Sequence, residues 1–136
     1  MKVTLIEPSA NFAAEPNMNP PLGLSYISSY LKSKNIGQIE CLDLTVPGIT
    51  LGSIPVNSDF YAIRGMTPQW NNLIEICKHI RHYNTYSPII IGGHHITNCP
   101  QDLPKEADYA VLGEGEYIME QILTNINIEN KQFHRI

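Results

Sequence analysis

The sequence has 136 residues, of which 43% are hydrophobic and 16% are charged. This length and composition predict one small domain with a real core, and they exclude a disordered chain. Nine Lys and Arg residues against thirteen Asp and Glu residues give a net charge of −4. No basic run is long enough to follow a phosphate backbone, so we expect no nucleic-acid partner.

No apolar run approaches the roughly 18 residues that a membrane span needs, and the first residues lack the pattern of a signal peptide. The three cysteines, Cys41, Cys77 and Cys99, are too far apart for a zinc knuckle, an iron–sulfur motif or a secreted disulfide framework. We therefore expect reduced thiols in a cytoplasmic domain with no membrane partner.

Short apolar runs alternate with amphipathic stretches along the first half of the chain. Proline is tolerated in a first helical turn, and stretches rich in proline and glycine are typical of loops. In chain order we expect a strand over Val3–Ile6, a loop over Ser9–Pro20, a helix from Pro21 to Gly37, a strand over Ile39–Asp43, a loop with at most one helical turn over Thr45–Ser58, and a strand over Phe60–Ile63.

The second half continues this alternation. Trp70, Leu73, Cys77 and Ile80 recur at helical spacing, and the apolar run before Gly92 is typical of a strand buried on both faces. In chain order we expect a helix over Gln69–Tyr83, strands over Pro88–Ile91 and Tyr109–Leu112, and a helix over Tyr117–Asn125. Residues 1–125 then form the domain, and residues 126–136 form a polar tail.

This order of elements predicts an α/β fold. We expect a flavodoxin-like or Rossmann-like, doubly wound, five-stranded parallel sheet of order 2-1-3-4-5 with helices on both faces. Ligands bind such sheets outside the carboxyl ends of the strands, and the glycines found there allow close approach of backbone N–H groups. The candidate binding residues that follow the strands are Pro8, Arg64, Gly65, Thr67, Gly92, Gly93, His94, His95, Thr97, Gly113, Glu114, Gly115 and Glu116.

Several segments together carry a family resemblance. They are Pro20-Pro21-Leu22-Gly23-Leu24-Ser25-Tyr26-Ile27, Asp43-Leu44, Asp59, Gly92-Gly93-His94-His95-Ile96-Thr97, Asp108 and Gly113-Glu114-Gly115-Glu116. From Val3 to Leu123 the chain resembles the N-terminal cobalamin-binding domain of cobalamin-dependent radical S-adenosylmethionine (SAM) enzymes. The resemblance implies a corrinoid at the carboxyl edge of the sheet, with its nucleotide tail passing Gly92 and Gly93. It adds Leu22 and Gly23 to the candidate cofactor-binding residues.

Two positions depart from the cobalamin domains known from other enzymes. The loop from Glu7 to Pro21 contains no histidine, so the resemblance implies cobalamin without a lower histidine ligand from this loop. Arg64 stands where the family usually has serine or another small residue. The sequence leaves three roles open for its guanidinium: a clash with the tail, a pair with the tail phosphate, or exposure to solvent.

We predict no metal site and no catalytic residue. His94 and His95, joined by Cys99 or Glu114, are the metal candidates, but adjacent histidines on an extended backbone point to opposite sides, and the usual zinc spacings are missing. Glu114 and Glu116 have no nucleophile near them in the motifs, and the three-cysteine cluster of radical SAM enzymes is absent from the sequence.

The leading hypothesis is a stand-alone cobalamin-binding-type domain, a corrinoid carrier or accessory module that acts with a radical SAM catalytic subunit in trans. The alternative is a degenerate Rossmann-like module that has lost cobalamin and takes a nucleotide, another phosphate ligand or a protein partner. A free-standing enzyme is the third hypothesis, and no nucleophile–base pair in the motifs supports it.

Overall fold

The computed structural model describes residues 1–9 and 22–125, and all bounds refer to this part of the chain. The strands are β1 (Lys2–Glu7), β2 (Gln38–Asp43), β3 (Phe60–Arg64), β4 (Ile89–Gly92) and β5 (Tyr109–Ala110). The α-helices are α1 (Leu22–Ser33), α2 (Trp70–Tyr83), α3 (His94–Asn98) and α4 (Glu116–Asn125), and short 3₁₀ helices cover Leu51–Ser53, Thr67–Gln69 and Pro100–Asp102. The loop predicted up to Pro20, the helix start predicted at Pro21 and the tail predicted over 126–136 lie outside the described residues.

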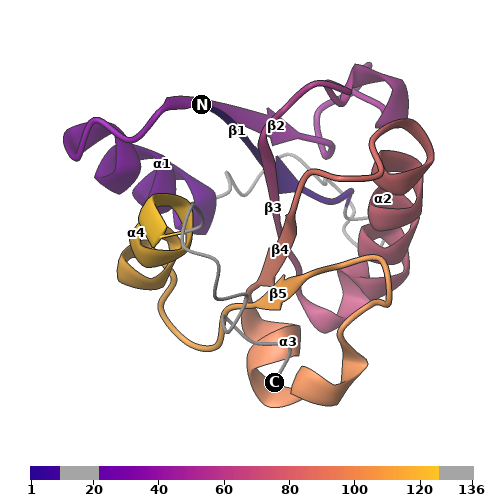
Figure 1. Ribbon diagram of the computed structural model, residues 1–136. Coiled ribbons are helices and arrows are strands. Elements are labelled where there is room, and N and C mark those ends of the chain that lie inside the picture. The colour runs from indigo at the N-terminus through magenta and orange to yellow at the C-terminus, as the bar shows by residue number, and fades with distance from the viewer. Residues whose placement is uncertain (10–21, 126–136) are drawn as a thin grey trace.

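The strands form one parallel sheet in the order β2-β1-β3-β4-β5, which confirms the predicted topology. Helices cover both faces, with α1 and α4 together on one side and α2 on the other (Figure 1). The register places Arg64, at the end of β3, beside Gly92, at the end of β4. None of the helices in the described ranges combines the length and apolar character that crossing a membrane requires.

Neighbouring side chains on a strand point to opposite faces of the sheet, and helices cover both faces, so the central strands β3 and β4 are buried on each side. On β3, Phe60 and Ala62 pack toward α1 and α4, whereas Tyr61 and Ile63 pack toward α2. The apolar run Ile89–Ile91 of β4 is at most 1% exposed, as its sequence predicts. The sheet thus has two separate core layers, one on each face.

The first helix, predicted to run to Gly37, ends at Ser33, and most other predicted bounds shift by one residue. Two further segments differ in other ways. The last strand ends at Ala110, although the Val111 amide still donates to the Ile91 carbonyl at 2.8 Å. The segment after Gly93, predicted as extended, contains α3, and Thr97 Oγ1 donates to the Gly93 carbonyl at 2.8 Å within it. A helix of five residues is too short for an apolar periodicity to reveal it.

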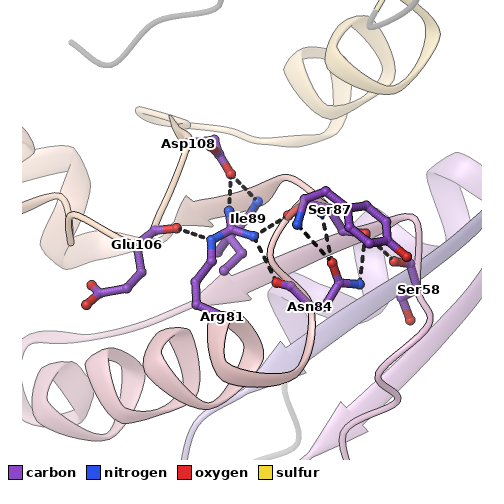
Figure 2. A network of polar contacts seen from close by, with 8 residues as sticks. Ser58, Arg81, Asn84, Ser87, Ile89, Glu106 and Asp108 are labelled. Atoms are coloured by element: carbon purple, nitrogen blue, oxygen red, sulfur yellow. Dashed lines mark hydrogen bonds and ion pairs between the residues drawn. The ribbon is translucent and has the colours of Figure 1, made fainter.

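A polar network ties the amino ends of β3, β4 and β5 together, at the edge opposite the predicted site (Figure 2). Asn84, which is 3% exposed, lies at its centre. Its Nδ2 donates to the Val56 carbonyl and to Ser87 Oγ, both at 3.0 Å, and its Oδ1 accepts from the Ser87 amide at 2.9 Å. Ser87 Oγ in turn donates to the Ser58 carbonyl at 2.7 Å.

Arg81 completes this network from α2. Its Nε donates to the Glu106 carbonyl at 2.9 Å, and its Nη2 pairs with the Asp108 carboxylate at 2.5 Å. The same Asp108 oxygen accepts from the Ile89 amide at 2.9 Å, at the start of β4. Asp108 is one of the residues that carry the family resemblance, and in the fold it links α2 to the amino end of β4.

We expect Asn84→Ala to lower the free energy of unfolding by about 1–3 kcal/mol, because it leaves buried partners of the amide without hydrogen bonds. Urea denaturation followed by circular dichroism measures the change. Asn71→Ala, at an exposed position of α2, is the control and should stay within about 0.5 kcal/mol of the parent. Equal effects of the two substitutions would contradict the structural role of the network.

Candidate functional site

A cavity of about 190 Å³ opens beside the carboxyl ends of β3 and β4, on the sheet face covered by α1 and α4. It gathers predicted site residues from separate parts of the chain, because the parallel register brings the strand ends to one edge. The predicted residues that line it are Gly23, Arg64, Gly92, Gly93, Gly113, Glu114, Gly115 and Glu116.

Other predicted site residues do not line this cavity. Pro8 is buried at the end of β1, where its carbonyl accepts from Gln69 Nε2 at 3.0 Å. Thr97 supports the rim from behind, since its Oγ1 accepts from the Gly113 amide at 3.0 Å. Leu22 begins α1, and its side chain lies outside what the structure describes. The remaining predicted residues outside the cavity lining are Gly65, Thr67, His94 and His95.

The sequence reasoning missed the apolar wall of the cavity. Residues two apart on a strand share a face, so Ala62 and Ile90 lie on the same side of the sheet as Arg64 and Gly92. Strand alternation therefore contained a signal for these residues, whereas the contribution of the helices depends on how α1 and α4 pack. The lining residues that were missed are Leu24, Ile27, Ala62, Ile63, Ile90, Val111 and Met119.

Gly92 and Gly93 are glycines for different physical reasons. A Cβ on Gly92 would meet nothing closer than Val111, at 3.9 Å, so a side chain there would occupy cavity space. Gly93 has φ +102° and ψ −174°, a conformation that is nearly restricted to glycine. A Cβ on Gly93 would also lie 2.9 Å from backbone atoms of Gly65. Gly92 therefore keeps the cavity open, and Gly93 lets two strand-end turns touch.

Arg64 places a cation at the cavity. Its guanidinium lies against Gly23, where a Cβ would come within 2.9 Å of Nη1. Within residues 1–9 and 22–125, the guanidinium of Arg64 forms no hydrogen bond or ion pair. The side chain is half-buried and lines the cavity, so its charge is available to a ligand at this edge of the sheet.

Glu7, at the end of β1, is a half-buried acid close to this edge. Its Oε1 accepts from Gln69 Nε2 at 3.1 Å, whereas its buried Oε2 has no hydrogen-bond partner in the part of the chain described. Burial raises the pKa of the Glu7 carboxyl, and the Gln69 hydrogen bond and the positive charge of Arg64 only partly offset that rise.

This pKa shift predicts a pH-dependent effect of Glu7→Gln. Because the folded pKa lies above the unfolded value, the stability that Glu7 contributes is present at low pH and is lost as the pH rises through the folded pKa. The gain in free energy of unfolding from Glu7→Gln should therefore be larger at pH 7 than at pH 4, as measured by urea denaturation at both. Glu40→Gln, at an exposed position on β2, is the control. A difference that is constant with pH would show that burial does not perturb Glu7.

His95 lies outside the cavity. The sequence predicts an extended backbone at this position, and the structure shows a helix instead. His95 belongs to α3, where its side chain is 10% exposed. Its Nδ1 is hydrogen-bonded to Thr67 Oγ1 and its Nε2 to Asp102 Oδ2, both at 2.8 Å. The ring of Trp70 stacks on it, with centroids 4.2 Å apart.

Comparison with known families agrees with this geometry. The family model described as the B12 binding domain matches residues 10–123, a span that ends within α4. The chain belongs to the B12-binding domain family. This membership confirms the predicted resemblance and, with it, the prediction of cobalamin as the cofactor.

Solved structures show the fold of this B12-binding domain in a larger protein. The cobalamin-dependent S-adenosylmethionine radical enzyme OxsB with aqua-cobalamin bound matches with a TM-score of 0.73 and 22% sequence identity. The same enzyme with aqua-cobalamin and S-adenosylmethionine bound matches with a TM-score of 0.70 and 21% identity. Each match covers 96% of this chain and 19% of the OxsB chain, so most of that enzyme has no counterpart here. A comparison with curated proteins gives no match.

Proposed function

We propose that this B12-binding domain holds cobalamin at the carboxyl edge of its sheet and presents it to a radical SAM catalytic subunit in trans. The observation that carries the proposal is the cavity beside Gly92, where glycines at the rim meet an apolar wall. Its volume of about 190 Å³ is below the roughly 300 Å³ of small-molecule pockets, so it suits the nucleotide tail and leaves the corrin ring outside. When bound, cobalamin supplies a cobalt centre that can carry a transferable group.

Different residues that line the cavity contact different parts of the nucleotide tail. Ala62, Ile90 and Val111 supply an apolar surface for the flat base of the tail, and the open backbone at Gly92 lets the tail pass. Arg64 supplies a cation for the phosphodiester of the tail, because guanidinium forms strong, paired hydrogen bonds to phosphate oxygens. The domain thus binds and orients the cofactor, and the chemistry belongs to the proposed partner.

Titration of the full chain with hydroxocobalamin under anaerobic conditions tests the proposal. We expect a shift in the cobalamin absorbance spectrum and co-elution of cofactor and protein on gel filtration. No binding at cofactor concentrations on the order of 10 μM would overturn it. Thermal stabilisation by a mononucleotide without stabilisation by cobalamin would instead favour the alternative of a phosphate-binding module, since a ligand of the native state raises its apparent stability.

The catalytic partner is tested separately. This domain corresponds to 19% of the OxsB chain, and a separate subunit that resembles the remaining part would carry out the chemistry. A radical SAM subunit that lacks its own B12-binding domain should co-elute with the cobalamin-loaded chain when the two are co-expressed. Separate elution of the two proteins would contradict a partner in trans and leave the cofactor proposal standing.

Arg64→Ser separates the three roles left open for this residue. If the guanidinium pairs with the tail phosphate, the substitution should weaken cobalamin binding by about tenfold to a hundredfold. It should leave the affinity for cobinamide, which lacks the nucleotide tail, unchanged. Tighter cobalamin binding would mean that Arg64 obstructs the tail, and unchanged binding would mean that it faces solvent. Lys78→Ser, which removes an exposed cation from α2, controls for net charge.

A further inference from the structure

A second cluster of chemistry-bearing side chains lies outside the cavity. A ring nitrogen of His95, Cys99 Sγ and an Asp102 carboxylate oxygen all lie within 4.8 Å of one another. The local fold brings them together: the Cys99 amide donates to the His95 carbonyl at 2.8 Å in the last turn of α3, and Asp102 follows in the 3₁₀ turn over Pro100–Asp102. One imidazole, one thiol and one carboxylate therefore converge from a stretch of eight residues, His95 to Asp102.

His95 is oriented in the way that metal-ligating histidines are. Such residues offer one ring nitrogen to the metal and donate the N–H of the other to an oxygen that fixes the ring. Here Thr67 Oγ1 lies 2.8 Å from Nδ1, which leaves Nε2 directed at Asp102. The imidazole is held in place because it packs against the tilted ring of Trp70 and its side chain is only 10% exposed.

We propose that His95, Cys99 and Asp102 bind one divalent cation of the zinc class. Nitrogen, sulfur and oxygen ligands together suit a borderline-soft ion, and three protein ligands leave the fourth tetrahedral position to water. Zinc–ligand bonds of about 2.0–2.3 Å in a tetrahedral site place the ligand atoms roughly 3.3–3.8 Å apart. The 2.8 Å contact between His95 and Asp102 must therefore open, and the wider spacings in the cluster, of up to 4.8 Å, must narrow. Asp102 has the freedom for this, because its side chain is 43% exposed and sits on a short surface turn.

The cation would brace the rim of the cofactor cavity. Thr97, between His95 and Cys99, bonds to the Gly93 carbonyl at 2.8 Å and to the Gly113 amide at 3.0 Å, and both glycines line the cavity. A metal that joins the two ends of this segment therefore holds the part of α3 that supports the rim. This site and its proposed ion do not depend on whether cobalamin is the ligand of the cavity.

Titration of the full, reduced chain with Co²⁺ tests the site directly, because a cobalt–thiolate bond gives a charge-transfer absorption band. We expect a band that saturates at one Co²⁺ per chain and disappears when Zn²⁺ is added. Cys99→Ser should abolish the band and weaken Zn²⁺ binding by more than the roughly 100-fold that loss of an outer hydrogen-bond partner can cost. Cys41→Ser, which changes an exposed cysteine outside the cluster, should leave both unchanged.

Two further variants keep the test decisive if Cys99→Ser fails to fold. Thr67→Val keeps all three ligands and removes only the oxygen at Nδ1, so Zn²⁺ affinity should fall about 10–100-fold with the cobalt band retained. His94→Gln changes the neighbouring exposed histidine and should have no effect. Absence of a charge-transfer band in the parent chain at saturating Co²⁺, or persistence of the band in Cys99→Ser, would overturn the proposal.

Discussion

Gly92→Ala should weaken cobalamin binding by about tenfold to a hundredfold and leave the unliganded domain folded. The added methyl group meets no protein atom closer than 3.9 Å and projects on the face of Ile90, which lines the cavity. In the unliganded protein it therefore costs little. In the complex it competes with the ligand for space, and overpacking by one methyl group costs about 1–3 kcal/mol.

Hydroxocobalamin titration measures the affinity of Gly92→Ala, and urea denaturation measures its stability. Gly52→Ala is the matched control: its nearest neighbour is Thr50 Oγ1, at 3.6 Å, and it lies in the 3₁₀ turn after β2, outside the cavity. We expect this control to bind cobalamin like the parent. Normal binding by Gly92→Ala would place the tail somewhere other than this cavity.

Gly93→Ala should have the opposite signature, a large loss of stability. Its backbone conformation is nearly closed to other residues, and the new Cβ would lie 2.9 Å from the backbone nitrogen and oxygen of Gly65. The neighbour is backbone and cannot rotate away as a side chain could. We expect the free energy of unfolding to fall by about 2–4 kcal/mol.

Gly48→Ala separates the two causes of this loss. Gly48 also has a positive φ, +86°, but a Cβ there would meet nothing within 4 Å. Its substitution therefore reports the conformational cost alone, about 1–3 kcal/mol, and Gly93→Ala should exceed it because of the clash. Urea denaturation of both variants provides the comparison. Equal losses would show that the contact with Gly65 relaxes without cost.

The order of the elements and of the strands could be predicted because it rests on patterns that repeat along the sequence. The apolar run of β4 and the helical spacing of Leu73, Cys77 and Ile80 each identify one element, and right-handed crossovers then leave few sheet orders. The same logic placed Arg64 and Gly92 at one edge. The family motifs identified positions, and they did not say which role each residue has: Asp108 fastens the amino edge, and Gly93 accommodates a backbone contact.

The sequence offered His95 and Cys99 as metal candidates, but the arrangement that brings them to Asp102 could not be predicted, because it depends on a helix of five residues and on a contact between two distant turns. On an extended backbone, His95 and Cys99 would not lie one turn apart. Thr67 and Trp70 reach His95 only because the segment after β3 packs beside α3, at the same edge of the sheet. Short helices and side-chain meetings between loops leave no periodic trace in a sequence.

The polar network at the amino edge has a consequence for engineering this domain. Among residues 1–9 and 22–125, Asn84 and Arg81 share no hydrogen-bond partner with Gly92 or Arg64, since the two groups lie at opposite ends of the strands. Substitutions at the two ends should therefore have additive effects on free energy. Stabilising substitutions at the amino edge can therefore offset the stability lost when residues at the carboxyl edge are changed to alter cofactor specificity. The two ends can be adjusted independently.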